Sequence, residues 1–167
     1  PDGFGSQVTR IVVDRTDGES LQRNIPKVLY DVVFDDIAYC SNDVKILLDT
    51  VRCKRYVQVS TMSVYPKLHN DIREEEYDPK ANELIYCSRN DDTYDKVKQQ
   101  AESAIVQVYS HIPSAMVRFP FVIGTDDYTK RLYFYVDHIV NQKPMSVDNM
   151  DAKMAFVRSD EAGKFLA

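Results

Sequence analysis

"RYVQVSTMSVY", residues 55–65, is the stretch that decides the fold. Its first half is rich in β-branched and aromatic residues, which predicts a strand over residues 55–60. Hydroxyl side chains gather where that strand ends, at Ser60, Thr61 and Ser63. In open parallel sheets, ligands bind beyond the carboxyl ends of the strands. We therefore expect the functional site at the end of this strand.

Strand and helix signals alternate along the rest of the chain, which predicts an α/β fold. Further strands are predicted over residues 8–13, 29–34, 115–119 and 156–157. Helices are predicted over 16–24 with Thr16 as N-cap, over 44–51, 94–109 and 129–142, and after a cap at Ser159. Helical connections imply crossovers between parallel strands, so strands 29–34, 55–60 and 115–119 should lie side by side and parallel. Residues 66–92 form a polar loop, and a loop of that length is more often functional.

Tyr94 and Lys98 stand four residues apart in one predicted helix. One such spacing is about what chance gives in a chain with 11 tyrosines, so the spacing alone carries little information. Both residues share a helix face with Ala101 and Ile105, however, and should point towards the sheet. A nearby cation lowers the pKa of a phenol, which can then exchange a proton with a substrate hydroxyl or carbonyl. In the alternative, both side chains are in water and Lys98 is free or pairs with Glu102.

Composition and charge narrow the class of protein. Apolar residues make up 44% of the chain and the net charge is −5, with no strong cluster of Lys and Arg, which argues against a nucleic-acid partner. No apolar run approaches the length of a membrane span. The three cysteines have no C-x-x-C spacing, which favours reduced thiols in a cytoplasmic protein. The three histidines have no metal-ligand spacing, so no metal site is expected.

Five segments occur in the order typical of a known family. They are DVVFDDIAY (31–39), RYVQVSTMSVY (55–65), YDKVKQQAE (94–102), VRFPFVIG (117–124) and FVRSDEAGKF (156–165). Together they resemble the NAD-dependent epimerase/dehydratase branch of the extended short-chain dehydrogenase/reductase family. The resemblance implies a Rossmann-like, doubly wound parallel sheet and NAD or NADP as the cofactor.

The resemblance also implies roles for particular residues. Thr61 would supply a catalytic hydroxyl, Tyr94 would be the acid/base, and Lys98 would bind the nicotinamide ribose and lower the pKa of Tyr94. The other expected cofactor contacts are Asp14 near the adenine, Ala38, Ser60, and Phe119 and Pro120 near the nicotinamide. Expected substrate contacts are Ser63 and Arg131, with a solvated helix charge as the alternative role for Arg131.

The chain departs from the family pattern at its start. The glycine-rich fingerprint G-x-x-G-x-x-G is absent, so we expect residues 1–167 to be a single partial domain, truncated at both ends, that does not hold a dinucleotide by itself. Strand 8–13 would lack its usual neighbour and would pair with strand 29–34, with another chain, or with nothing. Met62 stands where dehydratases have an acidic residue, which disfavours dehydration. Ile37 replaces a smaller residue and would crowd the cofactor.

Two functions stay open at this point. The first is an NAD(P)-dependent epimerase/dehydratase-like oxidoreductase in the full-length protein, acting on a hydroxyl or carbonyl carbon of a small nucleotide-sugar or sugar-like substrate. The alternative is a catalytically idle binding or regulatory protein on the same fold. An exposed parallel edge would favour association into a homo-oligomer.

Overall fold

The computed structural model describes residues 5–125, 127–147 and 149–167. Its helices and strands are, in chain order, α1 Gly18–Asn24, β1 Leu29–Tyr30, β2 Val33–Asp35, α2 Ser41–Thr50, β3 Arg52–Cys53, β4 Tyr56–Thr61, α3 Tyr94–Val108, β5 Ser114–Phe119, β6 Phe121–Ile123, α4 Arg131–Val140, β7 Phe156–Arg158 and α5 Ser159–Leu166. The 3-10 helices are Gly5–Gln7, Met62–Val64 and Glu74–Glu76.

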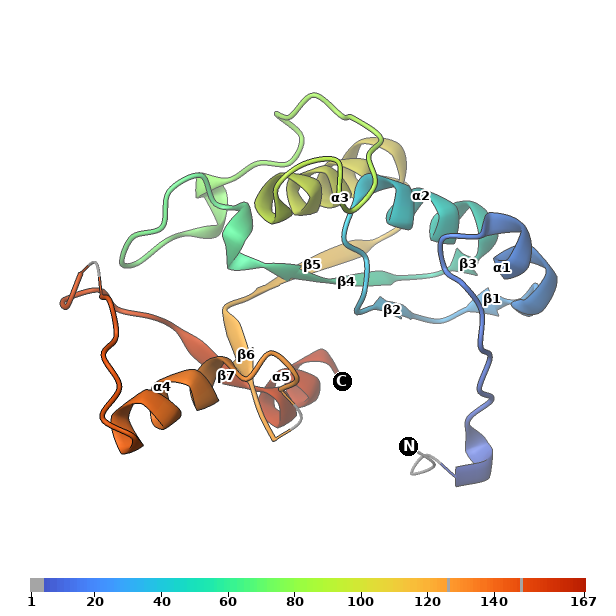
Figure 1. Ribbon diagram of the computed structural model, residues 1–167. Helices are drawn as coiled ribbons and strands as arrows, with labels where there is room; N and C mark the ends of the chain where they lie inside the picture. The colour runs from blue at the N-terminus through green and yellow to red at the C-terminus, as the bar shows by residue number, and fades with distance from the viewer. Residues whose placement is uncertain (1–4, 126, 148) are drawn as a thin grey trace.

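A parallel sheet with the strand order β2-β4-β5 forms the centre of the molecule (Figure 1). This order confirms that the strands predicted over 29–34, 55–60 and 115–119 lie side by side and parallel. The first of them is interrupted, because β1 pairs with β3 and β2 pairs with β4. A second parallel pair, β6 with β7, follows the central sheet. The fold is therefore α/β with parallel sheets, as predicted.

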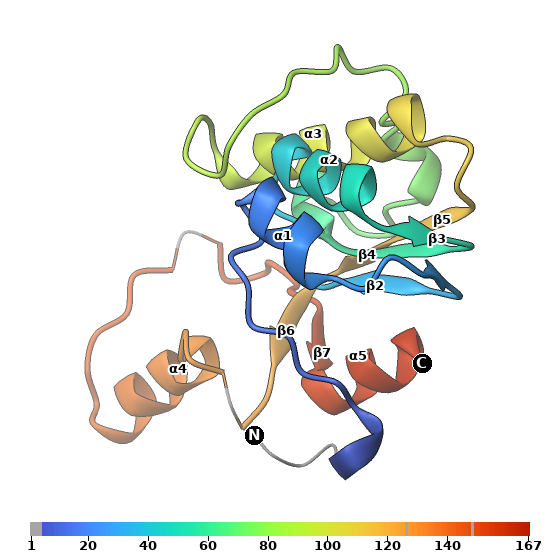
Figure 2. The same cartoon turned by 90° about the vertical axis from the view of Figure 1, so that its right-hand side faces the viewer.

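Side chains alternate between the two faces of β4. Tyr56, Gln58 and Ser60 are buried, whereas Val57 and Val59 are only partly buried on the other face. Helices α2 and α3 lie together over the first face (Figures 1 and 2). The period of two along the strand thus sends every second residue into the layer between sheet and helices.

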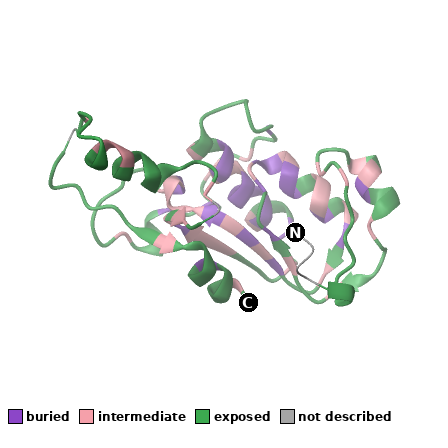
Figure 3. Ribbon diagram, turned by 60° about the horizontal axis from the view of Figure 1, so that its bottom comes forward, coloured by how far each residue is buried: buried purple, intermediate pink, exposed green. Residues whose placement is uncertain are grey.

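The hydrophobic core fills that layer. Helix α3 contributes Ala101, Ala104 and Ile105, which pack against Val44 of α2 and Tyr56 of β4 in one cluster. The small alanines let the helix approach the sheet closely. In Figure 3 the buried residues concentrate in α2, α3 and the central strands, and the C-terminal helices are mostly exposed.

The other face of the sheet is covered less completely. Helix α5 lies on that side (Figures 1 and 2), where the ring of Phe165 meets the ring of Phe119 with centroids 6.2 Å apart. The start of α5 crosses the chain at Gly124, where an added Cβ would lie 2.3 Å from the Oγ of Ser159. The Cβ of Ser159 would lie 3.1 Å away, so a side chain at position 124 would force the Ser159 hydroxyl to turn away.

Three sequence-based expectations about local structure are wrong: the strand over residues 8–13, the cap of α1, and the cap of α5, where Arg158 and not Ser159 is the N-cap. Residues 8–13 do not form a strand, because they have no neighbouring strand to pair with in this structure. Asp17, not Thr16, caps α1, and its carboxylate accepts from the backbone N–H of Ser20. Thr16 bonds to Asp14 instead.

Within the described residues, none of the helices is both long enough and apolar enough to cross a membrane.

Candidate active site

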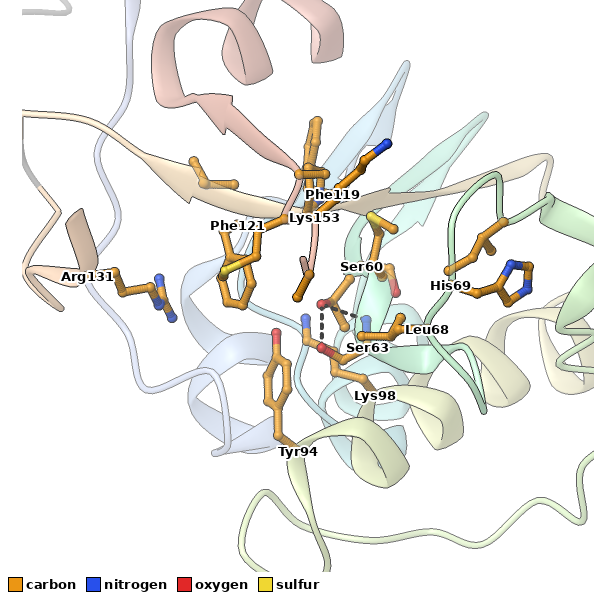
Figure 4. A pocket seen from close by; sticks show the side chains of 18 of the residues that line it. Ser60, Ser63, Leu68, His69, Tyr94, Lys98, Phe119, Phe121, Arg131 and Lys153 are labelled. Atoms are coloured by element: carbon orange, nitrogen blue, oxygen red, sulfur yellow. Dashed lines mark hydrogen bonds between the residues drawn. The ribbon is translucent and has the colours of Figure 1, made fainter. Parts of the chain in front are cut away.

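A pocket of about 1030 Å³ opens at the carboxyl ends of β4 and β5. Its walls come from the end of β4, the start of α3, the turn after β5 and two distant segments, 68–72 and 151–155. Figure 4 shows the Tyr94 hydroxyl pointing into this pocket, with Phe119 and Phe121 across from it and Arg131 and His69 at the two ends. The pocket therefore lies where the sequence places the functional site.

Lys98 is one of the most buried charged residues of the chain, at 3% exposure. Its Nζ donates to the carbonyl oxygens of Ala38, at 2.8 Å, and Val59, at 3.1 Å. Tyr94 lies one turn earlier at the mouth of the pocket and is 48% exposed. The ammonium of Lys98 is 5.9 Å from the centre of the Tyr94 ring. The inward direction of Lys98 excludes the surface pair with Glu102.

Burial dominates the electrostatics of both residues. Burial lowers the pKa of Lys98, and the carboxylates of Asp35, Asp36, Asp43 and Glu102 oppose this change. Lys98 therefore loses its proton at a lower pH than a lysine in water does. The two backbone carbonyls that it bonds nevertheless favour the protonated ammonium.

The pKa of the Tyr94 phenol is raised, chiefly by burial. The main effects in the opposite direction are a hydrogen bond with the Thr61 side chain and the charge of Arg131. Lys98 is not among the main causes, and the expected lowering does not outweigh burial, so the net direction of the Tyr94 pKa is upward. At neutral pH Tyr94 is therefore a protonated phenol beside a hydroxyl.

The hydroxyl groups after β4 are ordered by local bonds. Thr61 caps the short helix Met62–Val64, where its Oγ1 accepts from the N–H of Ser63 and donates to the Ser63 hydroxyl, both at 3.2 Å. These bonds appear as dashed lines in Figure 4. This arrangement leaves the Thr61 side chain at the pocket wall beside Tyr94.

The Ser60 hydroxyl has a different partner from that of Thr61, because it donates a hydrogen bond to a buried carboxylate. The acceptor is Glu102, which is 0% exposed and pairs with Arg118 at 2.8 Å. Arg118 also donates to the Tyr65 hydroxyl and to the carbonyl oxygens of Glu74 and Tyr77. This network ties the loop of residues 66–92 to the sheet, and sequence reasoning missed it.

The structure brings most of the predicted site residues together. Those that line the pocket are Ser60, Thr61, Ser63, Tyr94, Lys98, Phe119, Pro120 and Arg131. Asp14 does not line it, because residues 8–13 form no strand and Asp14 bonds to Thr16 in solvent. Ala38 is fully buried and offers its carbonyl oxygen to Lys98. Neither residue is placed to contact a ligand in the pocket.

Several pocket residues were not predicted. Tyr39 lines the pocket directly after Ala38, while Ile37, which was expected to crowd a cofactor, is not among the lining residues. His69 and Lys153 come from segments far away in the sequence. The sequence carries no local signal for such residues, because their position depends on how the loops fold back.

The residues around the pocket suit the nicotinamide end of a dinucleotide better than its pyrophosphate. The pocket offers hydroxyls, a phenol and the apolar surfaces of Phe119 and Pro120, which suit a nicotinamide ribose. Within residues 5–125, 127–147 and 149–167, no glycine-rich turn joins a strand to a helix, so these residues give the pyrophosphate no cradle. The same residues contain no cluster of three His, Cys, Asp or Glu that could hold a metal ion.

Comparisons with known proteins agree with this fold. No protein-family model and no curated protein matches the chain. A solved structure of a Methylobacillus flagellatus protein, assigned by name to the NAD-dependent epimerases/dehydratases, aligns with a TM-score of 0.65 and 15% identity, covering 98% of this chain and 55% of the other. RMD from Pseudomonas aeruginosa, in complex with NADPH, aligns with a TM-score of 0.62 and 18% identity, covering 93% of this chain and 62% of the other.

The chain thus spans between half and two thirds of the length of these two structures. At such low sequence identity, the matches are evidence for the fold alone. They confirm that this chain has the α/β, Rossmann-like fold of the epimerase/dehydratase structures, as the resemblance in its five segments implied.

Proposed function

We propose that this chain is part of an NAD(P)-dependent oxidoreductase of the epimerase/dehydratase type. The reaction would take place at a hydroxyl or carbonyl carbon. The observation that carries the proposal is the meeting of three groups in one pocket: the Tyr94 phenol, the Thr61 hydroxyl and the buried Lys98. They stand at the carboxyl end of a central parallel strand, where ligands of such sheets bind.

Tyr94 is the proton donor and acceptor in this proposal. Because the pKa of its phenol is raised, Tyr94 is protonated at neutral pH and can give its proton to a carbonyl oxygen that is being reduced. Thr61 can hydrogen-bond the same oxygen and hold it near the phenol. NAD(P), when bound, would supply or accept the hydride. In the oxidising direction Tyr94 takes the proton back from the substrate hydroxyl.

The substrate class follows from the polar groups around the phenol. Arg131 and Lys153 line the same pocket and can bind phosphate groups, while Ser63 and Asn149 can bind sugar hydroxyls. This set favours a nucleotide-sugar or a sugar-like alcohol. RMD contains NADPH in its structure, which supports NAD or NADP as the cofactor here.

The proposal extends to the whole chain and its setting. We take residues 1–167 as one partial Rossmann-like domain of the enzyme, because the chain spans 55% and 62% of the two matched structures. Cys40, Cys53 and Cys87 are free, and burial raises the pKa of Cys40 to about 11, so these thiols fit a reducing, cytoplasmic setting. The side of β2 away from β4 favours pairing with a further strand or a second copy.

One observation favours an idle binding protein as the second candidate. The two carbonyl bonds of Lys98 and its burial keep the ammonium away from a ribose. A relative that has lost catalysis could keep this arrangement for stability. The two candidates differ in whether the Tyr94 hydroxyl matters for turnover.

The deciding experiment measures cofactor binding and turnover in the whole enzyme proposed here. Calorimetric titration with NAD, NADH, NADP and NADPH comes first, followed by a turnover screen with nucleotide-sugars. Tyr94→Phe should then abolish most of the turnover. Tyr86→Phe is the matched control, because Tyr86 is 46% exposed and lies outside the pocket. Tight dinucleotide binding without turnover for any substrate would favour the idle protein.

A further inference from the structure

Tyr39 is a pocket residue to which neither the motifs nor the proposed function assign a role. It lies between β2 and α2, in the turn that leads into α2, and it is half-buried. Its backbone N–H donates to the Asp43 carboxylate at 2.8 Å, which fixes the turn. Its side chain lies beside the start of α3, where Tyr94 and Lys98 are located.

The Tyr39 ring meets both members of the proposed catalytic pair. The ammonium of Lys98 lies 4.9 Å from the centre of this ring, closer than the 5.9 Å to the ring of Tyr94. The Tyr39 and Tyr94 rings meet edge to face, with centroids 5.9 Å apart and planes at 66°. Both distances lie in the favourable range for cation–π and aromatic pairs.

A second cation holds the Tyr39 ring from another part of the chain. The guanidinium of Arg89 lies 4.6 Å from the ring centre. Arg89 is itself anchored, since it donates to the Asp43 carboxylate and to the carbonyl oxygen of Ile37, both at 3.2 Å. Arg89 belongs to the loop 66–92, so this loop is connected to the pocket through the Tyr39 ring.

We propose that Tyr39 is a positioning residue, whose ring orients Tyr94 and shields Lys98 from solvent. This inference rests on the proposed function, in which Tyr94 moves the proton. The contacts with Lys98, Arg89 and Tyr94 all involve the ring, so phenylalanine can replace tyrosine here and leucine cannot.

The charges around Lys98 determine how its protonation should change when the Tyr39 ring is removed. Asp35, Asp36, Asp43 and Glu102 all favour the ammonium form, and burial opposes it. Removing the Tyr39 ring admits water to Lys98 while these carboxylates stay in place. Lys98 should therefore become more accessible and also easier to protonate. Because only the free amine reacts with an acylating agent, the two effects are separated by measuring the Lys98 rate at several pH values and comparing the rates of the free amine.

Shielding is tested on the 167-residue chain by pulse acetylation with acetic anhydride and mass spectrometry. In Tyr39→Leu, the free amine of Lys98, compared at full deprotonation, should react about tenfold faster than in the wild type, because the ring that covers it is lost. Tyr39→Phe should stay within about twofold of the wild type, by the same physical argument. Lys96, whose side chain is 61% exposed, is the internal standard. An unchanged Lys98 rate in a folded Tyr39→Leu variant overturns the proposal.

If Tyr39→Leu does not fold, Arg89→Gln decides instead. This change removes the cation that stacks on the Tyr39 ring, and Asp43 keeps its contact with Arg15 and the N–H of Tyr39. The Lys98 acetylation rate should rise roughly threefold, because the Tyr39 ring is then held less firmly. An unchanged rate in Arg89→Gln overturns the shielding.

Positioning is tested by kinetics in the proposed enzyme. Tyr39→Leu should lower kcat about tenfold with KM within roughly twofold, because a misplaced proton donor affects the reaction step more than binding. Tyr39→Phe should retain kcat. Equal kcat in Tyr39→Leu and wild type overturns the positioning role. If Tyr94→Phe keeps full turnover, the proposed function fails on its own, and the acetylation rates still report whether Tyr39 shields Lys98.

Discussion

Glu102 offers a sharp test of the network beneath the pocket. Its carboxylate is 0% exposed, accepts from Ser60 and pairs at 2.8 Å with Arg118, whose side chain is 10% exposed. Glu102→Gln keeps the shape and one acceptor for Ser60 but removes the charge that compensates Arg118. The variant therefore isolates the electrostatic part of the network.

The expected cost follows from what Arg118 retains. Removing one partner of a buried ion pair typically costs ~3–5 kcal/mol. Arg118 keeps the Tyr65 hydroxyl and the carbonyl oxygens of Glu74 and Tyr77 as acceptors, so the loss should be smaller. We expect the free energy of unfolding to fall by about 2–3 kcal/mol. For a chain of this size, the melting temperature should fall by roughly 4–12 °C.

Urea unfolding followed by circular dichroism measures this change. Glu83→Gln is the control, because Glu83 is exposed and should leave stability within about 0.5 kcal/mol of the wild type. In the double variant Glu102→Gln/Arg118→Met, which has no unpaired charge, part of the lost stability should return. A Glu102→Gln variant as stable as Glu83→Gln would refute the reasoning.

The other predictions concern the pocket and its surroundings. In the proposed enzyme, Tyr94→Phe should lower turnover by about 10²–10⁴-fold with little change in stability, whereas Tyr86→Phe should not; turnover within about twofold of the wild type would show that Tyr94 is structural. Because the pKa of Tyr94 is raised, the rate of carbonyl reduction should not fall with Tyr94 ionisation until the pH is above the range in which a free phenol ionises, and a loss assigned to Tyr94 near neutral pH would contradict this assignment. The 167-residue chain alone should not bind NAD, NADH, NADP or NADPH in calorimetry, and micromolar binding of any of them would show that a cradle exists. Gly124→Ala should destabilise the chain by about 1 kcal/mol, since its Cβ would lie 3.1 Å from the Ser159 Cβ and the Ser159 hydroxyl must turn away, and unfolding at wild-type stability would show that this contact relaxes fully.

Local patterns along the chain were sufficient to predict the main strands and helices. The alternating side chains of residues 55–60 predicted a strand, and β4 covers Tyr56–Thr61. The face shared by Lys98, Ala101 and Ile105 predicted the buried side of α3. These predictions succeeded because each depends on the period of one element, 2 in a strand and 3.6 in a helix, which neighbouring residues determine.

Predictions that needed a partner from elsewhere failed or were missing. Residues 8–13 have the β-branched sequence of a strand, but a strand also needs a neighbour for its backbone hydrogen bonds. Asp14 was placed near a cofactor on the assumption that this strand forms. The buried ion pair of Glu102 and Arg118 joins residues 16 positions apart on a helix and a strand, and no local pattern indicates that both lie inside.

The sequence by itself determined the alternation of strands and helices, the direction of Lys98 and the position of the hydroxyls after β4. Only the tertiary structure decided which groups share the pocket. The Tyr39 ring reaches Lys98 across 59 positions of the chain because β2 and β4 are adjacent and α3 lies over them. Electrostatics depends on such distances and on burial, so the pKa of Tyr94 is raised in the folded chain although its sequence neighbour Lys98 predicted the opposite.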